Sequence, residues 1–192
     1  MTTLAPPRRK SHRFTVAEYE RMVEMGLVPE GRNTEFIRGE VVQKMPHGEL
    51  HDTGVEFLNE ALHGALNRSV TIRCQSAIRL DDSEPEPDIV VCVRSGQRGG
   101  RHPVPAEIFL VVEVADSSLL GDRTDKLMLY AENNIPEYWI VNLPDDCVEV
   151  CTRPVAAEQR YDSRVVYGRG QSVPLTIAGL APVSVAVDSI LP

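Results

Sequence analysis

The chain has 192 residues, of which 42% are hydrophobic and 25% are charged, a balance typical of one globular domain with a full core. No apolar run approaches the length of a membrane-spanning helix, and no apolar core follows the basic N-terminal residues, which argues against a secretory signal. The formal net charge of -8 argues against a protein whose whole surface binds nucleic acid, so any such contact must come from local patches.

The N-terminal residues and the cysteines give the first expectations. We expect residues 1–12 to form a mobile leader and residues 13–192 to form one domain. The four cysteines form no CxxC pair, and Cys92 lies inside the apolar run IVVCV, where a cysteine acts as a small buried hydrophobe. Reduced structural thiols predict a cytoplasmic protein. No set of cysteines and histidines has zinc-ligand spacing, which argues against a thiol or zinc enzyme.

Local signals near the N-terminus predict a capped helix and a hairpin. Thr15 and Glu18 have the spacing of a capping box, so a helix is expected to begin after Thr15 and to end at Gly26. Two short strands are expected on either side of a tight turn at Arg38 and Gly39.

Apolar and polar patterns place the remaining elements. An apolar stripe at helical spacing runs from Val55 to Leu66. The elements expected after the hairpin are a helix over 51–67, a strand within 70–80, a short buried strand over 88–93, a strand from 108, a helix over 122–133, strands over 137–143 and 147–153, and short strands over 161–168, 172–180 and 181–187. Strands with interspersed helices favour an α/β or α+β fold: a mixed central sheet flanked by helices, with additional C-terminal strands.

The strand IFLVVEV, which begins at Ile108, carries one carboxylate, Glu113. Alternation places the even-numbered residues on one face and the odd-numbered residues, Glu113 included, on the other. Both faces are apolar, so the strand is expected to be covered on both sides. A carboxylate there is costly unless a cation or strong donors meet it, and an arginine partner is the structural alternative to a metal.

Two further polar features stand out. Pro87 cannot donate to a sheet, so it marks the start of the strand DIVVCV and leaves the carboxylate of Asp88 at the strand mouth. Asp122, Lys126 and Tyr130 follow at four-residue spacing, so all three point to one side of a helix. Their structural alternatives are a strand-end aspartate, a solvated salt bridge and a core tyrosine.

Taken together, these features predict a divalent-cation site. Asp88 and Glu113 lie at the ends of consecutive buried strands, and Lys126 lies on the next helix. Mg²⁺ prefers a few carboxylates and several waters, and a nearby lysine can orient a nucleophile or stabilise charge on a phosphate.

Three sequence blocks, in this order, resemble one family of nucleases. They are SEPEPD at 83–88, VVEVADSSL at 111–119 and DRTDKLMLYAENNIPEYWIVNL at 122–143, and the segment 14–51 is similar to the opening helix, hairpin and histidine of that family. The family is the Uma-type putative restriction endonucleases, of the PD-(D/E)XK nuclease superfamily. The resemblance covers roughly residues 12–143 and is looser beyond. It implies a restriction-endonuclease-like fold.

The resemblance also implies roles for individual residues. Asp88 becomes the aspartate of the PD pair, and Glu113 becomes the acid of the second motif, so both would be metal ligands. The superfamily pattern expects a lysine two residues after the glutamate, where this chain has Ala115. In Uma-type proteins the lysine comes from the following helix, and Lys126 matches that place.

Four more residues match family positions near the metal. Glu35 matches an early glutamate of the site, and its structural alternative is a cross-strand partner of a basic residue. Tyr130 matches a tyrosine one turn after the lysine, and Gln75 matches a glutamine that lines the site. His51 matches a histidine at the start of the second helix, where a histidine without a site role is also common.

The glycine-rich segment 94–102 supplies Arg94, Arg98 and Arg101 without an acidic residue. These arginines are candidates for contacts with DNA phosphates, and a solvated loop is the alternative.

The residues and the resemblance predict a Mg²⁺-dependent endonuclease that hydrolyses DNA phosphodiester bonds, with Mn²⁺ as the alternative cation. The expected partner is DNA, bound through local contacts, and a homodimer is compatible with this class. No membrane partner is expected. The competing function is a nuclease-like fold with weak or no catalysis that acts as a binding or regulatory module, since a fold does not fix a function. Binding of divalent cations would distinguish the two.

Overall fold

A computed structural model describes residues 11–28, 34–44, 46–66, 68–94 and 101–192, so most of the expected leader lies outside the described residues. Its centre is a six-stranded sheet in the order β3-β4-β5-β6-β7-β8. The strands are β3 (Val70–Cys74), β4 (Ile89–Val93), β5 (Ile108–Ala115), β6 (Glu137–Asn142), β7 (Cys147–Val155) and β8 (Arg160–Gly168). Strands β5 and β6 pair in parallel and the other neighbours pair antiparallel, so the sheet is mixed, as predicted.

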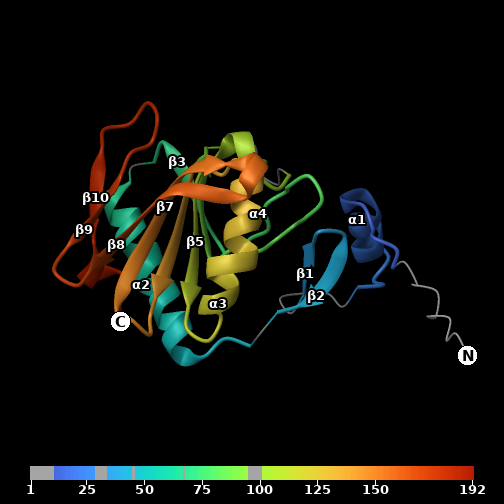
Figure 1. The fold of residues 1–192 in the computed structure, drawn as a ribbon, viewed down its shortest axis with the longest axis horizontal. Coiled ribbons are helices and arrows are strands. Elements are labelled where there is room, and N and C mark those ends of the chain that lie inside the picture. Colours follow the sequence, from blue (N-terminus) through green and yellow to red (C-terminus); the bar gives the residue numbers. More distant parts are fainter. Residues whose placement is uncertain (1–10, 29–33, 45, 67, 95–100) are drawn as a thin grey trace, which may run out of the picture.

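Helices cover both faces of this sheet (Figure 1). Helix α2 (Glu49–Ala65) lies against one face, where its residues Val55, Leu58 and Leu62 pack on β4, β5 and β6. The strands β9 (Ser172–Leu175) and β10 (Val183–Ala186) form a separate hairpin that extends the same apolar core. Helix α4 (Leu127–Glu132) covers the opposite face. None of the helices in the described ranges is long and apolar enough to cross a membrane.

Strand β5 is covered on both faces, as its sequence predicted. Val112 belongs to the core under α2 and Val111 to the core under α4. The alternation fails at the start of the strand, where Ile108 packs under α4 and Phe109 packs with the core under α2. The reason is a register shift in the pairing of β4 with β5, which sets Cys92 opposite Ile108. An irregularity of this kind adds one residue to one strand and so reverses the side-chain faces beyond it.

The expected helix over 122–133 begins earlier and is not uniform. It consists of α3 (Leu119–Gly121), one turn of π-helix (Asp122–Lys126) and α4. Tertiary contacts fix the π turn, because Tyr138 donates its hydroxyl to the Asp122 carbonyl at 3.1 Å and Arg123 binds Glu149. Such turns occur often at functional sites.

The strand expected within 70–80 is shorter than predicted. It ends at Cys74, because Gln75 takes a left-handed backbone conformation with φ of 43°. All four cysteines are free, and only Cys74 is exposed.

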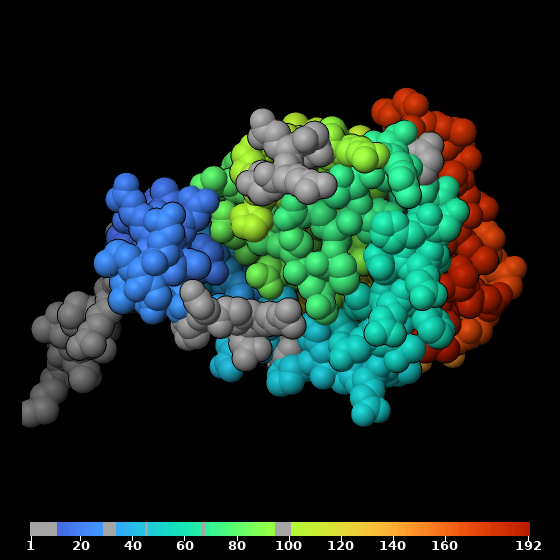
Figure 2. Space-filling view, turned by 180° about the vertical axis from the view of Figure 1, so that it is seen from behind, coloured from blue at the N-terminus to red at the C-terminus, as the bar shows by residue number. Residues whose placement is uncertain are grey.

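The N-terminal elements form as predicted, and an isolated β-bridge is one of their contacts with the body. Helix α1 (Val16–Glu24) begins at the Thr15 capping box, and β1 (Thr34–Ile37) pairs with β2 (Glu40–Gln43) around the Arg38 and Gly39 turn. Phe36 bonds to the backbone of Glu84 in the loop before β4. Figure 2 shows these N-terminal residues as a lobe beside the body. Glu35, the buried residue next to Phe36, is thereby placed at the end of the central sheet.

Candidate active site

A cavity of about 510 Å³ lies at the end of the sheet where β4 begins and β5 ends. The β1–β2 hairpin, the segment leading into α2, and the π turn form its other walls. Its ionisable lining residues are Glu35, Lys44, His47, His51, Glu86, Asp88, Glu113, Asp116, Asp122, Asp125 and Lys126. The structure therefore brings together the four residues predicted to be catalytic.

Asp88 immediately precedes β4 and is 5% exposed. Its Oδ2 atom accepts the backbone N–H of Val114 on β5 at 2.8 Å, and it lies 3.1 Å from His51 Nε2. The antiparallel pairing of Ile89 with Val112 sets these groups side by side. The carboxylate is held by a strand and a helix from opposite sides.

Glu113 meets a lysine and a tyrosine rather than the arginine considered as its structural partner. Its Oε1 atom accepts the Tyr130 hydroxyl at 2.6 Å and lies 3.2 Å from Lys126 Nζ. Burial raises the pKa of Glu113, and Lys126 acts against this, while Asp88 and Asp122 add to it. The side chain is therefore a buried acid in surroundings with an excess of negative charge.

Lys126 lies in the π turn and connects two carboxylates that are far apart in the chain. Its Nζ atom lies 2.9 Å from Glu35 Oε1 and 3.2 Å from Glu113 Oε1. Burial opposes the charge of Lys126, but the two carboxylates outweigh it and raise the pKa of the ammonium group. Lys126 therefore stays protonated at neutral pH, so it can stabilise negative charge and cannot serve as a base.

The cavity holds more buried acids than buried cations. Glu35, Asp88, Glu113 and Asp122 are each at most 7% exposed. Burial, together with the neighbouring carboxylates, raises the pKa of Asp122 to about 6, against the effects of its Ser118 hydrogen bond and of Lys126. Uncompensated buried carboxylates are costly, and a bound divalent cation is one way to balance them. The donor set thus fits a metal.

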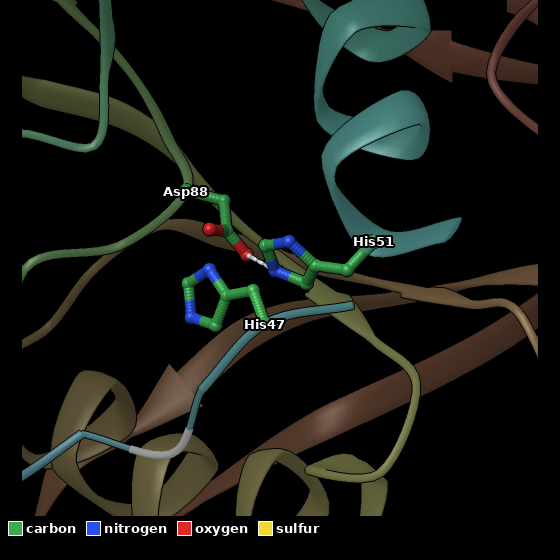
Figure 3. Close-up of side chains that lie close together, drawn as sticks. All are labelled: His47, His51 and Asp88. Atoms are coloured by element: carbon green, nitrogen blue, oxygen red, sulfur yellow. Dashed lines mark hydrogen bonds and ion pairs between the residues drawn. The ribbon is translucent and has the colours of Figure 1, made fainter. Parts of the chain in front are cut away.

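Two histidines reach Asp88 from the beginning of α2 (Figure 3). The rings of His47 and His51 have centroids 3.9 Å apart and are tilted by 39°. His51 Nδ1 also lies 3.4 Å from Asp52 Oδ1. Burial and the neighbouring His51 ring lower the pKa of His47, whereas the two aspartates overcome burial and raise the pKa of His51.

Among the described residues, one set of three metal-ligating side chains has all its ligand atoms within 4.8 Å of one another, namely His47, His51 and Asp88. That set contains Asp88 but not Glu113 or Glu35. No sequence pattern singled out His47, because it precedes α2 in a loop. Its four-residue spacing from His51 becomes meaningful only when Asp88 lies opposite both rings.

The other predicted residues lie at different depths. Tyr130 is fully buried and reaches Glu113 from α4. Gln75 does not line the cavity, since its side chain is exposed and its contribution is the backbone N–H that it donates to the Asp88 carbonyl at 2.9 Å.

Two of the three arginines predicted to contact DNA, Arg94 and Arg101, lie away from the cavity. Arg94 follows β4 and donates to the Arg68 carbonyl, and Arg101 forms an exposed bidentate pair with Glu107 just before β5. Arg94 lies six residues beyond Asp88, roughly 20 Å along the strand, and Arg101 lies beside Glu107 at the same far end of β5. Arg98 lies outside the described residues.

A mixed sheet flanked by helices, with carboxylates at the ends of adjoining strands, defines a restriction-endonuclease-like fold. A crystal structure from Anabaena variabilis ATCC 29413, described as a putative nuclease belonging to DUF820, has this fold. It is 16% identical, with a TM-score of 0.61 over 88% of this chain and 96% of that chain. A family model described as Uma2, putative restriction endonuclease, matches residues 16–187, and the chain belongs to this family. No curated protein matches the chain. The predicted family and fold class are confirmed.

Proposed function

We propose that the chain is a metal-dependent endonuclease that hydrolyses DNA phosphodiester bonds in this cavity. The observation that carries the proposal is the ammonium group of Lys126, which is buried between Glu35 and Glu113 beside a third acid, Asp88. Membership of a family described as restriction endonucleases supports the same activity. The lysine replaces the one that the superfamily pattern would place at Ala115.

The carboxylates fit Mg²⁺, with Mn²⁺ as an alternative. Asp88 and Glu113 would hold the cation, and Glu35 would complete its outer surroundings, because Mg²⁺ binds a few carboxylates and keeps several waters. When bound, such a cation would act as a Lewis acid on the scissile phosphate and would lower the pKa of the attacking water.

The chain's own groups orient these acids. The Val114 N–H and His51 hold the Asp88 carboxylate, and the Tyr130 hydroxyl holds Glu113. Each contact fixes an oxygen atom before substrate arrives, so little reorganisation is required during the reaction.

Lys126 supplies the positive charge. An ammonium group has three N–H donors, and Glu35 and Glu113 take two of them. The third can donate to a phosphate oxygen or to the attacking water. Because the carboxylates keep the lysine charged, this donor stabilises the negative charge that develops on the phosphate in the transition state.

The test is cleavage of supercoiled, linear and single-stranded DNA by the full chain with Mg²⁺ or Mn²⁺. Asp88→Asn and Glu113→Gln keep the size of each side chain and should abolish metal-dependent cleavage. Asp81→Asn is the matched control, because Asp81 is an exposed acid in the loop before β4, and it should cut like the wild type.

Absence of cleavage on every DNA form with both cations would refute the proposal and favour the binding or regulatory module. Cleavage that survives both Asp88→Asn and Glu113→Gln would refute the assignment of the site and point to a contaminating nuclease.

A further inference from the structure

The two imidazole rings beside Asp88 are not explained by a cation held through carboxylates alone. His47 is exposed and belongs to no helix or strand, yet its ring lies 3.9 Å from the buried ring of His51. Their nitrogen atoms and an Asp88 oxygen lie within 4.8 Å of one another. A tetrahedral metal with ligands at about 2.1 Å needs ligand atoms about 3.4 Å apart. The three side chains therefore need only a modest contraction to share one ion.

The surroundings orient these side chains as ligands. Asp52 lies 3.4 Å from His51 Nδ1, so the other ring nitrogen, Nε2, is the one that faces Asp88 at 3.1 Å. Metal-bound histidines commonly have a carboxylate at the nitrogen that does not bind the metal, which fixes the ring and its tautomer. The Val114 N–H fixes Asp88 in the same way.

We propose that His47, His51 and Asp88 form a binding position for a divalent transition-metal ion, next to the Mg²⁺ position of the proposed function and sharing Asp88 with it. Imidazole nitrogen suits Zn²⁺, Co²⁺ and Cu²⁺, whereas Mg²⁺ and Mn²⁺ prefer oxygen ligands. One carboxylate and two neutral rings leave a dication with a net positive charge. Three protein ligands leave at least one coordination position, and this position can bind water or a phosphate oxygen in the cavity.

This inference rests on the proposed function, because it adds a transition-metal ion beside the Mg²⁺ position. Its test does not depend on DNA cleavage. The metal-free full chain is titrated with Co²⁺ and separately with Mg²⁺ by calorimetry, and the Co²⁺ absorption spectrum is recorded. Pulsed electron paramagnetic resonance on the Cu²⁺ form reports nitrogen nuclei of rings that are bound to the ion.

The wild type should bind Co²⁺ at least about tenfold more tightly than Mg²⁺ and should show nitrogen coupling to Cu²⁺. His47→Ala should weaken Co²⁺ binding at least about tenfold and leave Mg²⁺ binding unchanged. His63→Ala is the matched control, since His63 is an exposed histidine in the last turn of α2, the helix that carries His51. This variant should bind Co²⁺ like the wild type.

Since His51 is buried, His51→Asn serves as a second variant, with its thermal unfolding measured alongside. It should lose the Co²⁺ spectrum while still unfolding cooperatively. Equal Co²⁺ affinity in wild type and His47→Ala, or no nitrogen coupling to Cu²⁺, would overturn the inference. In that case cleavage with Mg²⁺ would leave the proposed function intact. Conversely, Co²⁺ binding through the histidines without any cleavage would refute only the proposed function.

Discussion

Replacing Lys126 by methionine removes the ammonium group that joins Glu35 to Glu113, while an unbranched side chain still fills the space. In the wild type Nζ lies 2.9 Å from Glu35 Oε1 and 3.2 Å from Glu113 Oε1. After the change, Glu35 keeps the Glu86 backbone N–H at 2.8 Å, and Glu113 keeps the Tyr130 hydroxyl at 2.6 Å. Each carboxylate therefore retains one donor but loses its buried countercharge.

The expected loss of stability follows from the donors that the two carboxylates keep and the countercharge that they lose. Removing one partner of a buried ion pair costs about 3–5 kcal/mol, and the retained donors favour the lower end, about 3 kcal/mol at pH 8. Without Lys126, the pKa of Glu113 in the folded state, which burial already raises, rises further above that of the unfolded chain. The folded state then takes up protons that the unfolded state does not hold, so stability is lost as pH rises. At pH 5 we expect a loss of only about 1 kcal/mol.

The assay is urea unfolding of the metal-free protein at pH 5 and pH 8, followed by the fluorescence of Trp139, the single tryptophan, which is fully buried. Arg21→Met is the control, because Arg21 is an exposed cation on α1, and it should change stability by less than about 0.5 kcal/mol. Metal-dependent cleavage by Lys126→Met should fall by about 100- to 1000-fold.

An equal loss of stability at both pH values would refute the reasoning, since it would mean that Lys126 contributes packing and not charge. A variant more stable than the wild type at pH 8 would show that the two ion pairs contribute less free energy than the desolvation of Lys126 costs. Cleavage at the wild-type rate would remove Lys126 from the proposed mechanism.

Three further predictions concern stability and can be measured by urea unfolding. Burial raises the pKa of Glu84 to about 7, so the folded protein loses stability as pH rises from 4.5 to 7, and Glu84→Gln should gain up to about 3 kcal/mol at pH 8 but nothing at pH 4. A gain of equal size at pH 4 would contradict the titration. Gly54→Ala should destabilise by about 1–3 kcal/mol, because its Cβ would meet β5 at 3.0 Å. Gly64→Ala, on the same helix but with open space, should stabilise by about 0.5–1 kcal/mol, and the same sign for both would be inconsistent with the packing. Glu149→Ala should cost about 3–5 kcal/mol, because it leaves Arg123 without its buried partner, and a loss under 1 kcal/mol would show that solvent replaces that partner.

Local chemistry was enough to predict several elements. The Thr15 and Glu18 capping box requires only residues three apart, and the hairpin turn requires only residues that tolerate positive φ, as Arg38 and Gly39 do here. The buried strand around Glu113 was also predictable. Its apolar residues indicate burial, and a carboxylate among them is costly unless a partner meets it. These signals are contained within a few neighbouring residues.

The tertiary structure decided what meets each polar group. Lys126 reaches Glu35 across 91 residues of chain, and no local pattern encodes that distance. His47 and His51 face a third possible ligand only because α2 starts beside the beginning of β4, next to Asp88. The distance of Arg101 from the cavity was also decided by the tertiary structure, because the pairing of β4 with β5 places it at the other end of these strands.

The sequence by itself determined most of the helices and strands and the carboxylates that require a partner, because propensity, alternation and the cost of burying charge act over short range. The resemblance of whole sequence blocks indicated the family. Only the tertiary structure decided the register shift at Ile108, the π turn that carries Lys126 and the joining of α2 to Asp88. Those features depend on contacts between segments far apart in the chain, whose geometry is set by packing of the whole core and not by any one segment.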